Sequence, residues 1–295
     1  MYANARTPDR RELEHIGRVL GGWQDDDGPL HLHPGDLGWY SLRGAAATAA
    51  AMRVWSDADT IVAIALLDGP DLLRFAIDPA RCQDASLASR ISADVGDATA
   101  GVFEPGSATI EARGAAALGE ELMKRGWEPD EPWTPLRRSL AEPVEVSNLR
   151  IETVEPERTA EWVSVHWSAF RGTPMPHKRL RSFVDGWCAA ADAPFFSPGR
   201  ILLLRDEQDR PVAVSAVWSS GAARPGLIEP LGVSQEHRGL GYGAVMSRAA
   251  AATLREMGSS SATVCAESSN VGAVATYLAA GFVADPEVTD WRRDA

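Results

Sequence analysis

The apolar residues in the second half of the chain follow two periods, and these periods predict its elements. Short β-branched or alternating apolar runs predict strands at residues 149–154, 201–204, 211–219, 226–233 and 261–266. Apolar residues at helical spacing, or a run of strong helix formers, predict helices at residues 156–170, 179–191, 244–257 and 270–280. Charged residues separate the second and third strands and predict a hairpin. This half is therefore predicted to be an α/β domain.

A glycine-rich turn joins the strand at 226–233 to the helix at 244–257. Gly239, Gly241 and Gly243 occupy alternate positions in this turn. Because glycine has no Cβ, the backbone can adopt positive φ values and a ligand can approach its N–H groups closely. The first amides of the following helix lack intrahelical partners, and the helix dipole adds roughly half a positive charge there. The turn is therefore predicted to bind a phosphate or pyrophosphate.

Three kinds of phosphate-binding loop compete for this turn. A P-loop needs Gly-Lys-Ser/Thr, and the lysines of this chain, Lys124 and Lys178, are far from the turn. A dinucleotide fingerprint needs its third glycine three residues after the second, whereas Gly243 follows Gly241 after two. The remaining pattern of Arg238, Gly241 and Gly243 resembles the acetyl-CoA loop of the GCN5-related N-acetyltransferase (GNAT) superfamily.

A second signature follows about thirty residues later. Asn270, Ala273, Tyr277 and the pair Gly281-Phe282 come in this order after the strand at 261–266, and Gly281 is placed to end the helix as a C′ glycine. This order resembles the Asn, Ala, aromatic, Gly-Phe signature of the same superfamily. With both signatures in a strand-loop-helix-strand-helix context, residues 149–295 are identified as a GNAT domain.

The resemblance implies acetyl-CoA as cosubstrate and a set of residues that hold it. In the family the strands on either side of the loop splay apart, and the exposed peptide groups near Leu231 to Val233 bind the pantetheine arm like an added strand. The residues implied for binding acetyl-CoA are Leu231, Gly232, Val233, Arg238, Gly239, Leu240, Gly241, Tyr242, Gly243, Asn270 and Tyr277.

Acetyl transfer to an amine requires a base for the ammonium proton and an acid for the leaving thiolate. Glu229 lies within an apolar strand, where burying a carboxylate costs free energy unless it is paired. The resemblance implies that Glu229 is the general base, often through water, and that Tyr277 is the general acid. The alternatives are a solvent-facing acid at position 229 and a core aromatic at position 277. Glu267 and Ser268 are secondary candidates at the end of the next strand.

The acceptor side of the site is less clearly marked. The resemblance places the acceptor pocket near His166, Trp167, Phe170, Arg171 and the loop 174–177. His166 is expected to be a histidine on a helix face rather than a base, and the aromatic residues are expected to belong mainly to the core. Substrate choice would be determined in this region.

The first half of the chain repeats the second at a period of about 145 residues. Ser107 to Ile110 matches Ser261 to Val264, and Gly126-Trp127 matches Gly281-Phe282. The segment that corresponds to the phosphate loop, residues 80–86, has no glycine, and Leu122 replaces Tyr277. The chain is therefore predicted to be two tandem GNAT-like domains, a degenerate one at 1–145 and a catalytic one at 146–295. Each is expected to be a mixed, mostly antiparallel twisted sheet flanked by helices, and only the second is expected to bind acetyl-CoA.

Composition and charge limit the partners, metal sites and location that are expected for this protein. The net charge of −12 divides into −10 for residues 1–145 (14 basic, 24 acidic) and −2 for the rest (15 basic, 17 acidic), so nucleic acid is not an expected partner. Three widely spaced cysteines argue against a disulfide framework or a metal site. No apolar run reaches membrane-spanning length and the first residues are highly charged, so no membrane partner and a cytoplasmic location are expected.

These observations predict an acyltransferase that moves acetyl from acetyl-CoA to a primary amine of a small molecule. Direct attack in a ternary complex is expected because no side chain presents a nucleophile beside an evident base. A non-catalytic acyl-CoA-binding regulator and an acetyltransferase of protein lysines or N-termini are the alternatives. Because two copies within one chain can replace a dimer, the protein is expected to be a monomer or a homodimer.

Overall fold

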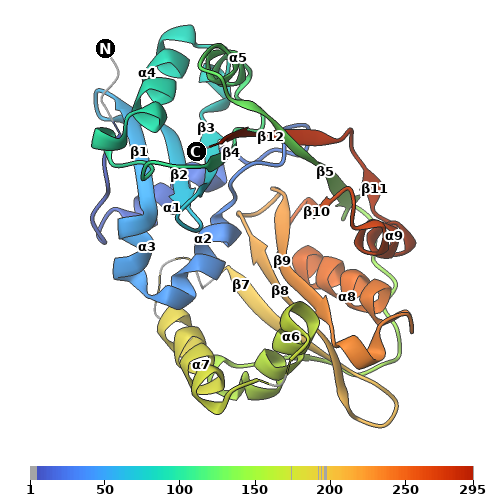
Figure 1. Cartoon of the computed structure of the whole chain (residues 1–295). Coiled ribbons are helices and arrows are strands. Elements are labelled where there is room, and N and C mark those ends of the chain that lie inside the picture. The colour runs from blue at the N-terminus through green and yellow to red at the C-terminus, as the bar shows by residue number, and fades with distance from the viewer. Residues whose placement is uncertain (1–4, 174, 192, 194, 196–197, 295) are drawn as a thin grey trace. The chain divides into compact units, whose positions relative to one another are not determined.

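The computed structural model describes residues 5–173, 175–191, 193, 195 and 198–294. The chain forms two compact units, each with its own hydrophobic core. The first unit comprises Met1–His33, Ala45–Trp133 and Glu287–Ala295, and the second comprises Pro34–Gly44 and Thr134–Pro286. The elements of both units are labelled in Figure 1.

The second unit is built on a mixed sheet in the order β5-β10-β9-β8-β7-β6 (Figure 1). Its strands are β6 (Ile151–Thr153), β7 (Gly199–Arg205), β8 (Pro211–Ser219), β9 (Gly226–Val233), β10 (Ser261–Glu267), β11 (Val283–Ala284) and the part of β5 (Glu128–Ser139) from Thr134 onward. Strands β6 to β9 pair antiparallel in chain order, which confirms the predicted hairpin, whereas β9 and β10 are parallel. The predicted α/β class is confirmed.

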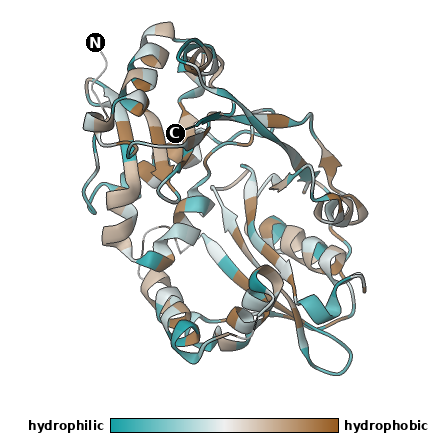
Figure 2. Ribbon diagram, in the orientation of Figure 1, coloured by the Kyte–Doolittle hydropathy of each residue, from teal (hydrophilic) through white to brown (hydrophobic). Residues whose placement is uncertain are grey.

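Helices cover both faces of this sheet. They are α2 (Pro34–Tyr40), α6 (Ala160–Arg171), α7 (His177–Ala191), α8 (Tyr242–Glu256) and α9 (Val271–Ala279). The side chains of β8 point alternately to the two faces of the sheet, so each face packs against its own layer of helices. Val214, Ala216 and Trp218 pack with α6 and α7, while Ala213 and Val217 pack with α8. Figure 2 shows hydrophobic residues along these strands and hydrophilic ones in the turn between β7 and β8.

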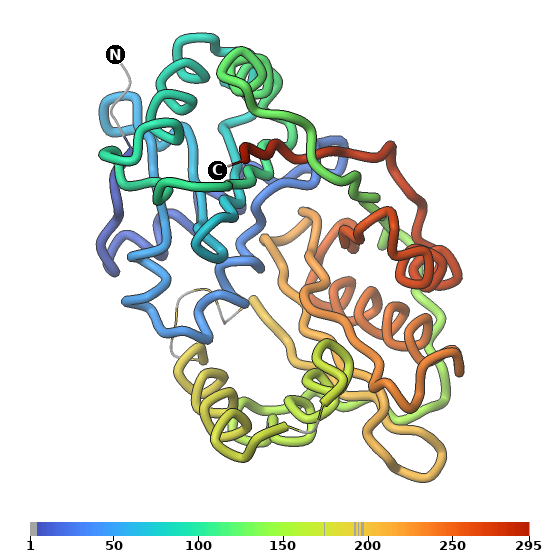
Figure 3. The backbone as a smooth tube through the Cα atoms, in the orientation of Figure 1, coloured from blue at the N-terminus to red at the C-terminus, as the bar shows by residue number. Residues whose placement is uncertain are grey.

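The first unit has a sheet in the order β1-β2-β3-β4-β12-β5. Its elements are α1 (Leu13–Gly22), α3 (Ala45–Ala51), β1 (Met52–Asp57), β2 (Thr60–Leu67), β3 (Leu72–Ile77), α4 (Ala85–Gly96), β4 (Ala108–Glu111), α5 (Ala116–Lys124), the start of β5 and β12 (Val288–Arg293). The sheet is antiparallel except where β3 meets β4. Figure 3 shows the last strand, in dark red, running beside the green β5.

The two units share one supersecondary pattern. In the first, β3, α4, β4 and α5 follow one another with β3 and β4 parallel; in the second, β9, α8, β10 and α9 do the same. The internal repeat therefore corresponds to a repeated strand-helix-strand-helix unit.

The compact units do not coincide with residues 1–145 and 146–295. Pro34–Gly44 packs in the second unit, and Glu287–Ala295 completes the sheet of the first. The boundary between the two copies near residue 145 stays a prediction. Within the described part of the chain, none of the helices combines the length and apolarity that crossing a bilayer requires.

Candidate active site

A cavity of about 660 Å³ lies in the second unit at the N-terminal end of α8. The predicted acetyl-CoA residues line it, with the exception of Leu240, whose side chain is 63% exposed. The lining consists of Ala169, Phe170, Leu231, Gly232, Val233, His237, Arg238, Gly239, Gly241, Tyr242, Gly243, Ala244, Asn270, Gly272, Ala273, Ala275, Thr276, Tyr277 and Ala279. We call this cavity the glycine-loop cleft.

The cleft exists because β9 and β10 separate. Their parallel ladder pairs Ala262 with Gly226 and Thr263 with Leu227, although β9 continues to Val233 and β10 to Glu267. The other edge of β9 remains paired with β8, with a register shift between Ser215 and Val217. The peptide groups of residues 231–233 therefore border the cleft on the side that β10 has left, as the resemblance implied.

The backbone of the turn has the geometry of an anion site. Gly239 has φ +75° and Gly241 has φ +86°, a region that favours glycine. A Cβ built on either residue would meet no atom within 4 Å, so the space above the turn is open. Gly241 caps α8, and the first intrahelical bond runs from the Val245 N–H to the Gly241 carbonyl. The amides of residues 242–244 therefore have no intrahelical acceptor and are available to a ligand.

Two other glycines serve close packing around the cleft. A Cβ on Gly243 would lie 2.8 Å from Thr276 Cγ2 on α9, and one on Gly232 would lie 2.8 Å from the Ala169 Cβ on α6. Any larger residue would push these helices away from the cleft.

Two predicted ligand residues also hold the walls of the cleft in place. The Arg238 guanidinium donates to the Ala169 carbonyl at 2.5 Å, which ties the turn to the end of α6. The Asn270 side chain accepts from the Ala273 N–H at 3.1 Å and caps α9. Both side chains line the cleft, and direct contact with acetyl-CoA stays a prediction for each.

Tyr277 is a buried residue in the lining of the cleft. Its side chain is 7% exposed, lines the cleft and packs edge-on against Phe282 at 5.7 Å between ring centroids. Burial raises the pKa of the Tyr277 phenol well above its ordinary value, and the nearby charge of Glu229 raises this pKa further. The hydroxyl therefore keeps its proton throughout the neutral range.

The three carboxylate and hydroxyl candidates differ in position. Glu229 is half-buried on β9; it is close enough to affect the pKa of Tyr277, although it is not among the residues that line the cleft. Glu267 is exposed at the end of β10. The Ser268 hydroxyl shares a hydrogen bond of 2.8 Å with the Thr134 hydroxyl, as expected of a residue with a structural role.

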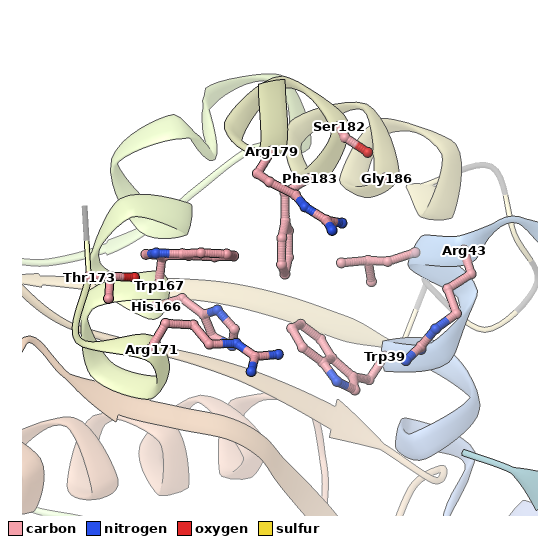
Figure 4. Close-up of a pocket in the computed structure, with 11 residues that line it drawn as sticks. Trp39, Arg43, His166, Trp167, Arg171, Thr173, Arg179, Ser182, Phe183 and Gly186 are labelled. Carbon is pink, nitrogen blue, oxygen red and sulfur yellow. The ribbon is translucent and has the colours of Figure 1, made fainter. Parts of the chain in front are cut away.

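A second cavity, of about 740 Å³, lies between α6, α7 and the segment Pro34–Gly44, all in the second unit (Figure 4). It is lined by Trp39, Leu42, Arg43, His166, Trp167, Arg171, Thr173, Arg179, Ser182, Phe183 and Gly186. We call it the α6–α7 pocket. It contains His166, Trp167 and Arg171 as expected, whereas Phe170 lines the glycine-loop cleft instead and Pro174 lies outside the described residues.

Sequence reasoning missed the contribution of the first half to this pocket. Trp39 and Arg43 come from a segment far upstream, in which no local pattern marks a binding residue. The glycines of α2 are the one available signal, because a Cβ on Gly35 or Gly38 would fall within 2.6 Å of Trp218 on β8. Such close packing holds α2 against the sheet that carries the pocket.

His166 forms part of the aromatic floor of the α6–α7 pocket. Its ring stacks on Trp162 at 5.1 Å between centroids, with 10° between the planes. Burial, together with the charge of Arg171, lowers the pKa of His166 to about 4, so the imidazole is neutral near pH 7. Its Nδ1 atom has no hydrogen-bond partner among the described residues.

The corresponding place in the first unit is closed to an anion. The Asp84 carboxylate accepts from the N–H groups of Ser86 and Leu87 and caps α4. Leu122, in the position of Tyr277, is fully buried in the core. Among the residues that the structure describes, no group of three or more His, Cys, Asp or Glu side chains is arranged to hold a metal.

Comparison with known sequences agrees with these features. The acetyltransferase (GNAT) family model matches residues 160–282. A mycothiol acetyltransferase from Sanguibacter keddieii is 27% identical over 183 residues, which are 60% of this chain. The match spans 57% of that relative's length.

Solved structures extend the likeness over both units. A tandem GNAT protein from the clavulanic acid biosynthesis pathway has TM-score 0.61 at 15% identity and covers 100% of this chain and 98% of its own. A GCN5-related N-acetyltransferase from Sphaerobacter thermophilus has TM-score 0.57 at 17% identity, and the match covers 99% of this chain and 95% of that protein. An acetyltransferase of the GNAT family from Colwellia psychrerythraea has TM-score 0.60 at 12% identity, and the match covers 99% of this chain and 100% of that protein. Residues 160–282 thus match the acetyltransferase (GNAT) family, and the chain as a whole has the fold of a tandem GNAT protein, with the sequence pattern of the family in its second copy.

Proposed function

We propose that the chain is an N-acetyltransferase that moves acetyl from acetyl-CoA to the primary amine of a small molecule, by direct attack in a ternary complex. The observation that carries the proposal is the glycine-loop cleft, in which a helix start with positive-φ glycines meets the gap between β9 and β10. Open amides suit the pyrophosphate, and the unpaired edge of β9 suits the pantetheine arm. The cleft therefore suits both the pyrophosphate and the pantetheine arm of acetyl-CoA.

Acetyl-CoA would supply the thioester, whose carbon–sulfur bond breaks as the carbon–nitrogen bond forms. Glu229 is proposed to take the proton that the attacking ammonium must lose, directly or through water. Tyr277 is proposed to give its proton to the departing sulfur, because its phenol is protonated at neutral pH, although the same burial makes it a weaker acid than a free phenol. One proton of the ammonium then resides on Glu229, and the phenol proton is on the thiol. The nitrogen loses its second proton as the amide forms, and this proton restores the Tyr277 phenol, so the step balances once Glu229 releases its proton to water.

The size and lining of the α6–α7 pocket favour a small acceptor over a protein tail. The pocket measures about 740 Å³, within the range of small-molecule sites, and shares α6 with the glycine-loop cleft. A non-catalytic acyl-CoA-binding regulator remains the second candidate, because a bound acyl-CoA would need the same cleft.

The test combines turnover and binding. The purified chain is incubated with acetyl-CoA and a panel of small primary amines, a lysine peptide and a peptide with a free N-terminus, and free thiol is measured with a thiol reagent. We expect thiol release above background with one or more small amines. CoA binding without turnover on any amine would support the regulator, and turnover on the peptides alone would support the protein acetyltransferase.

The cleft itself is tested by calorimetry on Gly241→Asp. The substitution places a carboxylate where the anion is proposed to bind, so we expect CoA affinity to fall at least tenfold. The matched control is Gly126→Asp in the first unit, because Gly126 has φ +83° and a Cβ there would also meet open space. CoA affinity unchanged in Gly241→Asp, or reduced equally in both variants, would overturn the assignment of the cleft.

A further inference from the structure

We propose that the acceptor amine carries an anionic group, a carboxylate or a phosphate, on an apolar or aromatic body, and that the α6–α7 pocket binds both parts. The inference rests on the proposed function, because it names the class of molecule that would receive the acetyl group. The pocket is the larger of the two cavities described above.

The interior of the pocket is aromatic. The Trp39 ring lies 6.0 Å from the Phe183 ring and 5.5 Å from the His166 ring, measured between centroids. His166 and Phe183 are themselves 5.4 Å apart, and Trp167 adds a further wall. Figure 4 shows these rings facing the enclosed space. Such a surface favours a ligand with an apolar or aromatic body.

The rim of the pocket is cationic. Arg43, Arg171 and Arg179 line it and are exposed at its edge, and no Asp or Glu is among the described lining residues. Figure 4 shows their guanidinium groups turned toward the enclosed space. Neither Arg171 nor Arg179 forms an ion pair with any residue that the structure describes. In a chain of net charge −12, a cavity edged by three arginines without an acid favours an anionic ligand.

The charge of the rim selects among ligands that an aromatic pocket can hold. Aromatic rings also bind cations, but three guanidinium groups repel a ligand that is only a cation. Their field has a second effect, because nearby positive charge lowers the pKa of an ammonium group and favours the neutral amine that attacks. An amine that also carries an anionic group is thus both attracted and activated.

The pocket is next to the glycine-loop cleft. On α6, His166, Trp167 and Arg171 line the pocket, while Ala169 and Phe170 line the cleft. The rings of His166 and Phe170 are 4.7 Å apart between centroids, so the linings of the two cavities are in contact through these side chains. A ligand anchored at the rim would then direct its amine past these two rings toward the cleft.

The inference is tested with unreactive probes, so that the result does not depend on turnover. Calorimetry in saturating CoA compares 3-phenylpropionate and phenyl phosphate with the neutral 3-phenyl-1-propanol. We expect either anion to bind at least tenfold more tightly than the alcohol, and the tighter of the two identifies carboxylate or phosphate as the preferred group. Binding of the anion should weaken as salt is raised. Equal affinity for the anions and the alcohol would overturn the inference.

Charge variants locate the anion. In Arg171→Gln/Arg179→Gln we expect the affinity for the anion to fall at least tenfold, with the affinity for the alcohol and for CoA little changed. Arg181→Gln is the matched control, because Arg181 lies on α7 with Arg179, is exposed and does not line the pocket. Loss of affinity for CoA would indicate misfolding, and the single variants Arg171→Gln and Arg179→Gln then replace the double one. Equal loss in Arg181→Gln would overturn the assignment.

A pair of amines separates this inference from the proposed function. Phenylalanine and phenethylamine differ by one carboxylate, and we expect phenylalanine to have the higher kcat/KM, with the difference lost in Arg171→Gln/Arg179→Gln. Equal use of both amines would overturn the anionic acceptor while the acetyltransferase stands. Arginine-dependent binding of 3-phenylpropionate without any acetyl transfer would overturn the proposed function while the anion site stands.

Discussion

At the scale of single residues, the second unit places its ionisable groups so that burial decides their protonation. Tyr277 and His166 are both largely removed from water, and in each case the neutral form is favoured. For a phenol this means a proton available to donate, and for an imidazole it means a ring that packs like an aromatic. The same physical cause thus gives one residue a proposed catalytic role and the other a structural one.

Tyr277→Phe tests the proposed acid. The variant keeps the ring that packs on Phe282 and removes only the hydroxyl. We expect turnover to fall by about 10²-fold, in the range of general-acid catalysis, with CoA affinity little changed. Steady-state kinetics and calorimetry measure the two quantities. Tyr40→Phe, outside both cavities, is the control, and full turnover in Tyr277→Phe would show that the hydroxyl is not an acid in this reaction.

His166 predicts a dependence of stability on pH. Its pKa is near 6.5 when unfolded and about 4 when folded, so the unfolded state binds the extra proton between these values. The free energy of unfolding should therefore fall as the pH drops from 6.5 toward 4, by about 3 kcal/mol for this group. Urea titrations at several pH values should show a weaker fall in His166→Phe. His15→Gln, at an exposed position, should keep the wild-type dependence, and the same dependence in His166→Phe would contradict the assignment.

At the scale of elements, two helices that occupy the same topological position differ in how the N–H groups of their first turn are satisfied. Helix α8 begins after Gly241 with open amides, whereas α4 begins with the Asp84 carboxylate on two of its amides. A side-chain acceptor at the N-cap satisfies the groups that an anion would otherwise bind. This difference leaves the helix start open to an anion in the second unit and closed to one in the first.

The packing of α2 on the sheet can be tested with Gly38→Ala. The added Cβ would lie 2.5 Å from Cζ3 of Trp218, a buried ring that cannot move aside easily. We expect a loss of about 1–3 kcal/mol in the free energy of unfolding, and weaker binding of 3-phenylpropionate because α2 carries Trp39. Gly96→Ala at the end of α4 is the control, since its Cβ would meet open space. Unchanged stability in Gly38→Ala would show that α2 is not closely packed.

At the scale of the whole molecule, the two units are not consecutive stretches of chain. The last strand, β12, lies between β4 and β5 of the first unit, and the early segment Pro34–Gly44 belongs to the second. Within the first unit, Arg113 and Asp290 form a buried pair with two hydrogen bonds, at 2.9 and 2.8 Å. Residues 287–294 therefore complete the sheet and a buried ion pair of the first unit.

Asp290→Ala tests the contribution of this ion pair to stability. Removing the carboxylate leaves the Arg113 guanidinium buried without its main partner, so we expect a loss of about 3–5 kcal/mol from the first unit. Calorimetric scans of Asp290→Ala should show a melting transition at a lower temperature than in the unchanged protein. Asp294→Ala, which breaks an exposed pair with Arg292, should change stability by less than about 1 kcal/mol. Similar scans for the two variants would contradict the role of the buried pair.

The local features of this protein could be predicted from its sequence. Strand and helix periods, the positions of Gly239 and Gly241, and the signature from Asn270 to Phe282 depend on neighbouring residues, so they predicted the elements, the family and the lining of the cleft. Even the loss of the loop in the first copy was visible, because residues 80–86 contain no glycine.

The way in which distant segments combine could be seen only in the folded chain. Trp39 and Arg43 reach the α6–α7 pocket, and Phe170 turns to the cleft, because helix packing on a shared sheet sets their positions. The proton on Tyr277 and the neutral ring of His166 likewise result from burial by residues from several elements. Burial and charge depend on contacts between segments far apart in sequence, so the chemistry proposed for the acceptor could be inferred only from the folded chain.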